Sequence, residues 1–214
     1  MVPDVLWKSV YGKAKKSGKV KRRSDFVAAL AYATELHASQ KRKGTSIPYI
    51  AHLLGVASLA FEYGADEDQA IAALLHDAVE DQGGTKTLQQ IDSRFGSTVA
   101  AIVDGCSETD VDPKPTWRHR KEAYLKRLTR EAPAVRLVSA CDKLHNVRAI
   151  IRDYRAHGDR LWRRFNGGKD GTLWYYSALV KVYQAAERTP VVADLAREVA
   201  TLRRLVRARA SHQS

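Results

Sequence analysis

Apolar residues recur along most of the chain at the three- and four-residue spacing of amphipathic helices, and no segment stands out with the two-residue period of a strand. Ser, Asp and Pro residues supply helix starts, and Gly residues supply stops. The pattern predicts helices over about 24–37, 48–63, 66–81, 87–95, 97–106, 133–151, 172–187 and 190–209, with another that begins at Trp117. We therefore expect an all-α protein, built as a single-domain helical bundle.

The segment 70–81, Ala-Ile-Ala-Ala-Leu-Leu-His-Asp-Ala-Val-Glu-Asp, is the most informative of these helices. Its first half is wholly apolar, which predicts burial, while its end carries His76, Asp77, Glu80 and Asp81. At helical spacing these four side chains can point at one small volume. Burying three carboxylates and an imidazole together is unfavourable unless a cation or a proton compensates the charge. A divalent metal is the simplest compensation; the alternative is a solvated acidic helix end beside a capped histidine.

Two further residues could complete a metal site. His52 lies on an apolar helix, where a protonated imidazole would be costly; the alternative is a hydrogen-bonded core histidine. Asp142 is a lone carboxylate within the apolar run 135–151, and its alternative partner would be Lys143 or Arg148. The predicted ligand set is His52, His76, Asp77 and Asp142. Two imidazoles and two carboxylates suit Mn²⁺, Fe²⁺ or Mg²⁺, with Zn²⁺ also possible, and differ from the thiolate-rich set of structural zinc.

The same cluster is typical of hydrolytic chemistry on phosphates. A divalent metal polarises a phosphoryl oxygen and lowers the pKa of a bound water, and Glu80 or Asp81 could accept the proton of that water. A substrate with several phosphates also needs cations at the rim of the site. The loop residues Lys41, Arg42 and Lys43 supply them, with Lys143 or Arg148 in addition. The alternative for the loop is a solvated charge run, which we favour less because a short turn containing Pro ties it to the helix of His52.

Composition places the chain among globular proteins. It has 214 residues, 44% of them hydrophobic, which is enough for one sizeable core. Cys106 and Cys141 both lie in apolar surroundings, so we expect reduced core residues rather than a disulfide. No run is apolar for the length of a membrane span and no signal-peptide pattern occurs, so we expect a cytoplasmic protein without a membrane partner.

The net charge of +12 is concentrated at the two ends of the chain. Residues 1–23 carry +7 and residues 196–214 carry +4, whereas residues 24–195 are nearly balanced at +1. The pattern predicts a flexible basic arm, a phosphohydrolase domain over 24–195, and a basic helix end with a tail. The arm could touch RNA or anionic surfaces, but the balanced domain argues against specific nucleic-acid binding. The oligomeric state stays open between monomer and homodimer.

Three motifs carry a resemblance to a known family. They are Arg42-Lys43 with Pro48-Tyr-Ile-Ala-His52, then Leu75-His-Asp-Ala-Val-Glu-Asp81, then Asp142-Lys-Leu-His-Asn146. In this order they resemble the motifs of the HD-domain metal-dependent phosphohydrolases. More closely, they resemble those of the hydrolase domain of RelA/SpoT enzymes and of the small alarmone hydrolases of Mesh1 type. The resemblance covers about residues 25–185 and implies an HD-domain helical bundle.

The resemblance also implies an activity, the hydrolysis of the 3′-pyrophosphate of ppGpp and pppGpp to GDP or GTP, usually with Mn²⁺. The four predicted ligands would bind the metal, Glu80 and Asp81 would act on water, Arg42 and Lys43 would meet phosphates, and Asn146 would contact the nucleoside. The segments 107–120 and 166–172 do not match the bifunctional enzymes, so the identity of the nucleotide stays open. The alternatives are an NADPH 2′-phosphatase or other nucleotide phosphohydrolase, and a non-catalytic HD-fold protein that binds a nucleotide or RNA.

Overall fold

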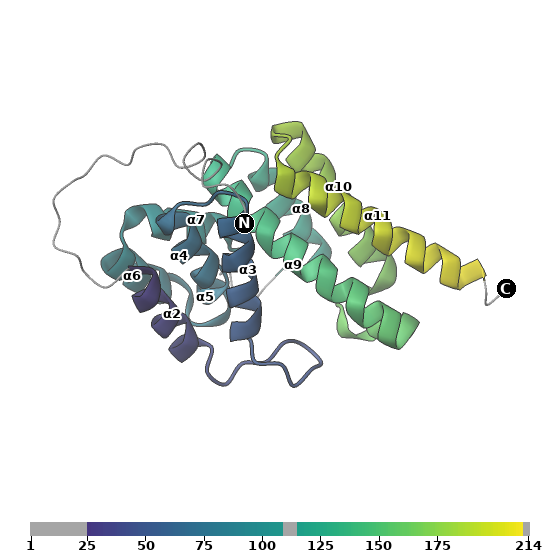
Figure 1. Cartoon of the computed structure of the whole chain (residues 1–214), viewed down its shortest axis with the longest axis horizontal. Helices are drawn as coiled ribbons and strands as arrows, with labels where there is room; N and C mark the ends of the chain where they lie inside the picture. The colour runs from purple at the N-terminus through teal and green to yellow at the C-terminus, as the bar shows by residue number, and fades with distance from the viewer. Residues whose placement is uncertain (1–24, 109–114, 212–214) are drawn as a thin grey trace, which may run out of the picture.

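The computed structural model describes residues 25–108 and 115–211, which form a bundle of helices (Figure 1). The helices are α2 (Asp25–Leu36), α3 (Ile50–Glu62), α4 (Glu67–Leu75), α5 (Ala78–Asp81), α6 (Gly84–Phe95), α7 (Ser97–Cys106), α8 (Trp117–Leu128), α9 (Pro133–His157), the 3₁₀ helix η1 (Gly158–Arg164), α10 (Gly168–Ala186) and α11 (Pro190–Ser211). These residues contain no strand apart from one isolated bridge between Lys41 and Pro48, so the all-α prediction is confirmed. The predicted basic arm lies outside the described residues.

The long helix α9 organises the bundle. It packs against α3, α4 and α7 on one side and against α10 and α11 on the other, so it lies between the two halves of the chain (Figure 1). Its buried residues include Val138, Leu144 and Val147, each without measurable exposure. Burying such side chains stabilises the fold by about 1.5–3 kcal/mol each. Asp142 lies on the same helix and is therefore carried into the core.

The capped start of α4 follows from its sequence. The side chain of Asp66 accepts a hydrogen bond from the backbone of Gln69, and the side chain of Gln69 accepts one from the backbone of Asp66, which forms a capping box. Every residue from Ala70 to Leu75 is buried. The predicted cap and the predicted burial are both confirmed.

The single helix predicted over 70–81 is wrong in one respect, because the structure divides it. Helix α4 ends at Leu75, and α5 begins at Ala78. The Nδ1 atom of His76 lies 2.9 Å from the carbonyl oxygen of Ala73, which would accept the amide of Asp77 in an uninterrupted helix. The imidazole therefore competes with the backbone amide of Asp77 for this carbonyl, and the helix is interrupted at His76 and Asp77.

Two other helices begin earlier than predicted. Helix α6 starts at Gly84 rather than near Thr87, and α10 starts at Gly168 rather than Thr172. The glycines of the segment 166–171, which we had placed outside the predicted helices, let the ring of Trp117 approach α10. A Cβ atom at Gly167 would lie 2.5 Å from that ring, closer than real contacts allow. In the described part of the chain, no helix is long and apolar enough to cross a membrane.

Candidate active site

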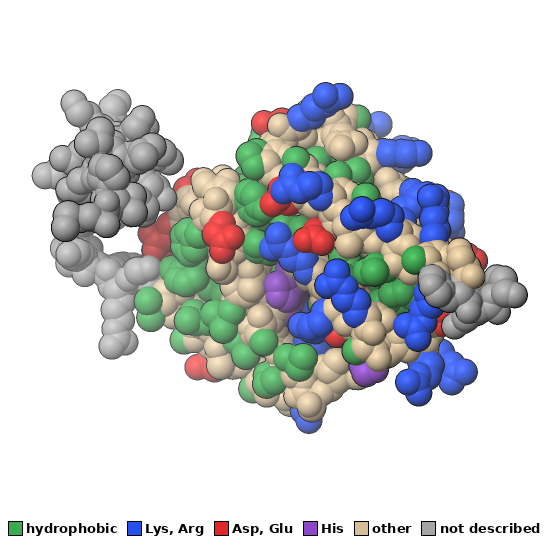
Figure 2. Space-filling model, turned by 45° about the vertical axis from the view of Figure 1, so that its right-hand side comes forward, with side chains coloured by type: hydrophobic (Ala, Val, Ile, Leu, Met, Phe, Trp, Pro, Cys, Tyr) green, Lys and Arg blue, Asp and Glu red, His purple; other side chains and the backbone are tan. Residues whose placement is uncertain are grey.

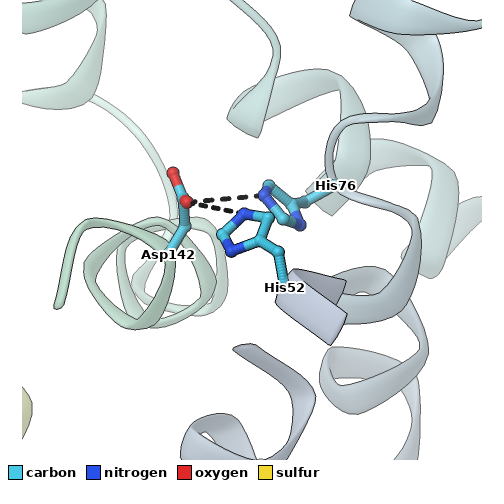
Figure 3. Close-up of side chains that lie close together, drawn as sticks. All are labelled: His52, His76 and Asp142. Carbon is cyan, nitrogen blue, oxygen red and sulfur yellow. Dashed lines mark ion pairs between the residues drawn. The ribbon is translucent and has the colours of Figure 1, made fainter. Parts of the chain in front are cut away.

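Three buried side chains from distant parts of the chain meet between α3, α4 and α9. The Nε2 atom of His52 lies 3.2 Å from Oδ1 of Asp142, and the Nε2 atom of His76 lies 3.6 Å from the same oxygen. Both imidazoles face the carboxylate of α9 (Figure 3). Ligand atoms of the three residues lie within 4.8 Å of one another, a spacing at which one ion can contact all of them. The sequence predicted all three as metal ligands.

The hydrogen bonds of the two imidazoles leave their Nε2 atoms available. His76 directs Nδ1 to the carbonyl of Ala73, and His52 directs Nδ1 to Nδ1 of His145 at 2.9 Å. Neither Nε2 atom has a hydrogen-bonding partner in the described ranges, although both are buried. Metal-binding histidines use this arrangement, in which one ring nitrogen is fixed by a neighbour and the other is free to coordinate. The residues therefore fit a divalent metal.

Asp77, the fourth predicted ligand, lies beside this group at the turn between α4 and α5. Its Oδ2 atom is 2.9 Å from Nε2 of His76 and 3.5 Å from Nε2 of His52. The hydroxyl of Tyr49 donates a hydrogen bond of 2.6 Å to the same oxygen. Burial and the neighbouring Asp77 carboxylate raise the pKa of Tyr49, so the tyrosine remains a donor. Asp77 is thus held in a position from which it can contact an ion shared with the two histidines.

Asp142 is charged in spite of its burial. Burial opposes its ionisation, but the ammonium of Lys143 at 2.6 Å and the two imidazoles that face the carboxylate hold its pKa well below the ordinary value. The side-chain amide of Asn146, one turn further along α9, donates a hydrogen bond to Oδ1. Lys143 is therefore both the ion-pair partner of Asp142 and a cation of the site. From the sequence, we had considered these two roles of Lys143 separately.

His145 is a site residue that our reading of the sequence missed. Its ring orients His52, and burial, His52 and Arg42 lower its pKa to about 4, so it is neutral and can accept a hydrogen bond from His52. Gly55 makes room for this ring, because a Cβ atom there would lie 2.4 Å from Nε2 of His145. The signal in the sequence was a glycine one turn after His52, within a helix that has no need of one.

Gly55→Ala should weaken metal binding by about 10- to 100-fold, the usual effect of disturbing a residue that orients a ligand. The added methyl group displaces the ring of His145, while the loss of a helical glycine should favour the helix itself by about 1 kcal/mol. Titration with Mn²⁺ gives the affinity, and Ser58→Ala, an exposed change on the same helix, is the control. In a His145→Ala background the clash is gone, so a further loss on adding Gly55→Ala would contradict this explanation.

The two acidic residues of α5 have different surroundings. Glu80 lines the main cavity, and burial, Glu108 and Asp77 raise its pKa. Asp81 is exposed, and its Oδ2 atom accepts a hydrogen bond of 2.7 Å from the side chain of Gln40. Partial desolvation of the carboxylate by the surrounding protein, together with Asp77, also raises the pKa of Asp81. Of the two predicted catalytic acids, Glu80 is the one that faces the cavity.

A cavity of about 530 Å³ borders the cluster of His52, His76 and Asp142, because His52 is part of its lining. The lining also includes Glu80 and seven cations, namely Arg42, Lys43, Arg120, Lys121, Lys143, Arg152 and Arg164. Figure 2 shows Lys and Arg side chains gathered mainly on the right-hand part of one face and hydrophobic side chains on the left. A cavity of this size and charge can hold a small phosphorylated ligand.

The predicted substrate residues fall into two groups. Arg42 donates a hydrogen bond of 2.5 Å to Asn146, and Lys43 donates one of 3.1 Å to Asn166, so the loop before α3 is joined to α9 and to the segment before α10. All of these residues line the cavity. Arg148 does not, because its side chain is 43% exposed and pairs with Glu198 of α11. We therefore leave Arg148 out of the proposed site.

The fold and this site define a class of protein. The model of the HD-domain family matches residues 29–173, which include every residue of the metal cluster. The chain therefore belongs to the HD-domain family.

Two curated relatives illustrate the similarity. The guanosine-3′,5′-bis(diphosphate) 3′-pyrophosphohydrolase of Aquifex aeolicus is 40% identical over 124 residues, which cover 57% of this chain and 17% of that protein. The MESH1 protein of Xenopus tropicalis, with the same enzyme name, is 36% identical over 127 residues, 58% of this chain and 68% of that protein. The chain thus spans only about one sixth of the length of the long bacterial relatives.

Two solved structures share the fold. A metazoan ortholog of SpoT, described as a protein that hydrolyses ppGpp, superposes with a TM-score of 0.68 at 23% identity, over 87% of this chain and 99% of that one. A protein of Listeria monocytogenes superposes with a TM-score of 0.62 at 28% identity, over 71% of this chain and 97% of that one. The predicted HD-domain bundle is therefore confirmed.

Proposed function

We propose that this protein is a metal-dependent hydrolase that removes the 3′-pyrophosphate of guanosine polyphosphates such as ppGpp. The observation that carries the proposal is the pair of buried, unpartnered imidazole nitrogens facing Asp142 at the end of a cavity lined by cations. The similar proteins of Aquifex aeolicus and Xenopus tropicalis that bear the name 3′-pyrophosphohydrolase support the choice of substrate. Net addition of water to the 3′-linked pyrophosphate would give GDP and inorganic pyrophosphate.

His52, His76, Asp77 and Asp142 are the proposed ligands of one divalent metal, with Mn²⁺ as the proposed ion. The mixed nitrogen and oxygen set suits that ion. When bound, it would polarise a phosphoryl oxygen and acidify a water. The protein contributes rigidity, because the imidazoles are held by Ala73 and His145 and the Asp77 carboxylate by Tyr49.

Glu80 is the proposed general base. It lines the cavity close to the cluster, and burial together with Glu108 and Asp77 raises its pKa. A base whose pKa is raised towards the working pH accepts a proton more readily than an ordinary glutamate does. Asp81 would have the supporting role, since its carboxylate is engaged by Gln40 at the surface.

The substrate would be oriented by the loop before α3 and by α9. Arg42 and Lys43 would contact phosphates, and Asn146, which bonds both to Arg42 and to Asp142, would connect the nucleoside to the metal ligand. Lys143, paired with Asp142, adds a further cation at the metal end. Charge-assisted hydrogen bonds of this kind fix the geometry of a phosphate as well as its affinity.

Product analysis tests the proposal directly. The full-length protein with Mn²⁺ should convert ppGpp to GDP and pyrophosphate, and should leave a plain nucleoside monophosphate intact. NADPH is included because release of its 2′-phosphate would instead support the alternative of an NADPH phosphatase. Absence of any hydrolysis of either substrate, in protein that holds its metal, would favour a binding protein of the same fold.

Replacing both Arg42 and Lys43 with Ala should lower kcat/KM far more than removing residues 1–20. Both side chains line the cavity, where they can contact the phosphates of the substrate. Each charge-assisted contact that is lost should raise the free energy of the transition state by about 1.5–3 kcal/mol. Losing the arm should change at most an encounter rate that depends on salt. The measurement is kcat/KM of both variants at two salt concentrations. If the truncated protein loses most of its activity while the Arg42/Lys43 double variant keeps the activity of the parent, the placement of the phosphate site is wrong.

A further inference from the structure

A second group of polar side chains lines the cavity, and the roles assigned above leave it unused. It consists of Glu108 after α7, Arg120 and Lys121 of α8, and Tyr175 of α10, and we call it the α8 wall. These residues come from three elements of the second half of the fold. Lys121 lies over the ring of Tyr175 at 4.6 Å and pairs with Glu108, so the members contact one another.

The side chains of the α8 wall are largely withdrawn from solvent, yet their hydrogen bonding is incomplete. The side chain of Glu108 is 7% exposed and Tyr175 is 5% exposed. The Oε2 atom of Glu108, the Nε atom of Arg120 and the hydroxyl of Tyr175 have no hydrogen-bonding partner in the part of the chain that the structure describes. Unpaired polar groups in a protein interior cost free energy. The two donors among them, the Nε atom of Arg120 and the hydroxyl of Tyr175, therefore mark a place where an anionic ligand can pair with this wall.

Arg120 is held loosely for a buried cation. One of its terminal nitrogens lies 3.5 Å from Oε2 of Glu108 and 3.7 Å from Oε1 of Glu80, and both separations exceed the roughly 2.7–2.9 Å of a charge-assisted hydrogen bond. Its planar fork is thus free to offer several N–H groups to another acceptor. A guanidinium in this state suits the oxygens of a phosphate, which it can bind with two parallel hydrogen bonds.

We propose that Arg120, Lys121 and Tyr175 form an anion subsite that holds the pyrophosphate group of the substrate beside the metal cluster. The three side chains present a guanidinium, an ammonium and a hydroxyl, all of which can donate hydrogen bonds, so an anion with several oxygens can satisfy them together. The nearness of Arg120 to Glu80 places this anion next to the proposed base. The identity of the anion rests on the proposed function. Arg42 and Lys43 are then left to bind the other phosphates of the nucleotide.

Calorimetric titration with inorganic pyrophosphate tests the subsite without requiring turnover. The full-length protein, carrying its metal, is compared with Arg120→Ala and with Arg118→Ala at one ionic strength. Arg118 is the matched control, because it lies on the same helix and carries the same charge, but its side chain is 53% exposed and pairs with Glu122. Arg120→Ala should weaken pyrophosphate binding about 10- to 100-fold, and Arg118→Ala less than about twofold.

Tyr175→Phe removes a single hydroxyl and keeps the packing, so it provides a second test if Arg120→Ala fails to fold. We expect pyrophosphate binding to fall about three- to tenfold with the metal content unchanged. Unchanged affinity in both the Arg120 and Tyr175 variants would overturn the subsite, as would an equal loss in Arg118→Ala. A parent protein that binds pyrophosphate through Arg120 but leaves ppGpp intact would support the subsite while contradicting the proposed function.

Discussion

Asp142→Asn should remove the bound divalent metal and lower hydrolysis of ppGpp by on the order of 10³-fold or more, since the metal supplies several kcal/mol of stabilisation to the transition state. Asp142 Oδ1 is the atom that both imidazoles face, so an amide in its place leaves the ion without its central negative ligand. Asp77→Asn should have the same outcome. Metal content by elemental analysis and activity with ppGpp check both variants.

Thermal melting gives a second measurement of the same loss. Metal at 100 times its dissociation constant should stabilise the parent by about 2.7 kcal/mol, and neither variant should respond. Asp194→Asn on α11 is the matched control. This carboxylate accepts a hydrogen bond of 2.6 Å from Tyr63 and is not part of the cluster of His52, His76 and Asp142. A full complement of metal in Asp142→Asn would refute the ligand assignment.

Glu80→Gln should keep the metal and lower kcat by about 10²–10⁴-fold, the usual contribution of a general base. The amide has the same shape as the carboxylate but cannot accept the proton of a water. Because Glu80 lines the cavity and is not in direct contact with the three-residue cluster, metal affinity should stay within a fewfold of the parent value. Single-turnover kinetics with ppGpp separates the chemical step from product release.

Asp81→Asn is the natural comparison for Glu80→Gln. Both variants remove one negative charge from α5, but Asp81 is exposed and bonded to Gln40. We expect a smaller loss of kcat for Asp81→Asn, of roughly tenfold or less. If Asp81→Asn is the more damaged enzyme, or if both turn over like the parent, Glu80 does not accept the proton.

The sequence predicted the helical bundle because amphipathic spacing, caps and helix-starting prolines agreed with one another along the chain. It also indicated the cluster of His52, His76 and Asp142, since polar residues within strongly apolar runs require a compensating partner. The break after Leu75 could not be predicted in this way. It depends on a hydrogen bond from an imidazole to the carbonyl of Ala73, and helical periodicity carries no information about that choice.

The place of His145 and the proposed roles of Arg120 and Tyr175 could not be predicted for a different reason. Each of these side chains contacts residues of other elements, such as His52 for His145 and Glu108 for Arg120. A periodic pattern shows which face of a helix is buried but not what that face meets. The exposure of Arg148 was missed in the same way, since its position on α9 turns it towards α11 rather than towards the cavity.

The wide separation of the buried ligands along the chain has a consequence for how the protein matures. Residues 52 and 142 are about 90 positions apart, so an ion that joins them acts as a cross-link across more than a third of the polypeptide. Closing so long a loop is entropically costly for an unfolded chain, which makes the ion a poor nucleus for folding and a good clamp once folding is complete. During synthesis, the ion cannot be captured by the full set of ligands until α9 has left the ribosome. Acquisition of the proposed metal would therefore be a late step, and starvation for metal should leave a folded but loosened protein rather than an unfolded one.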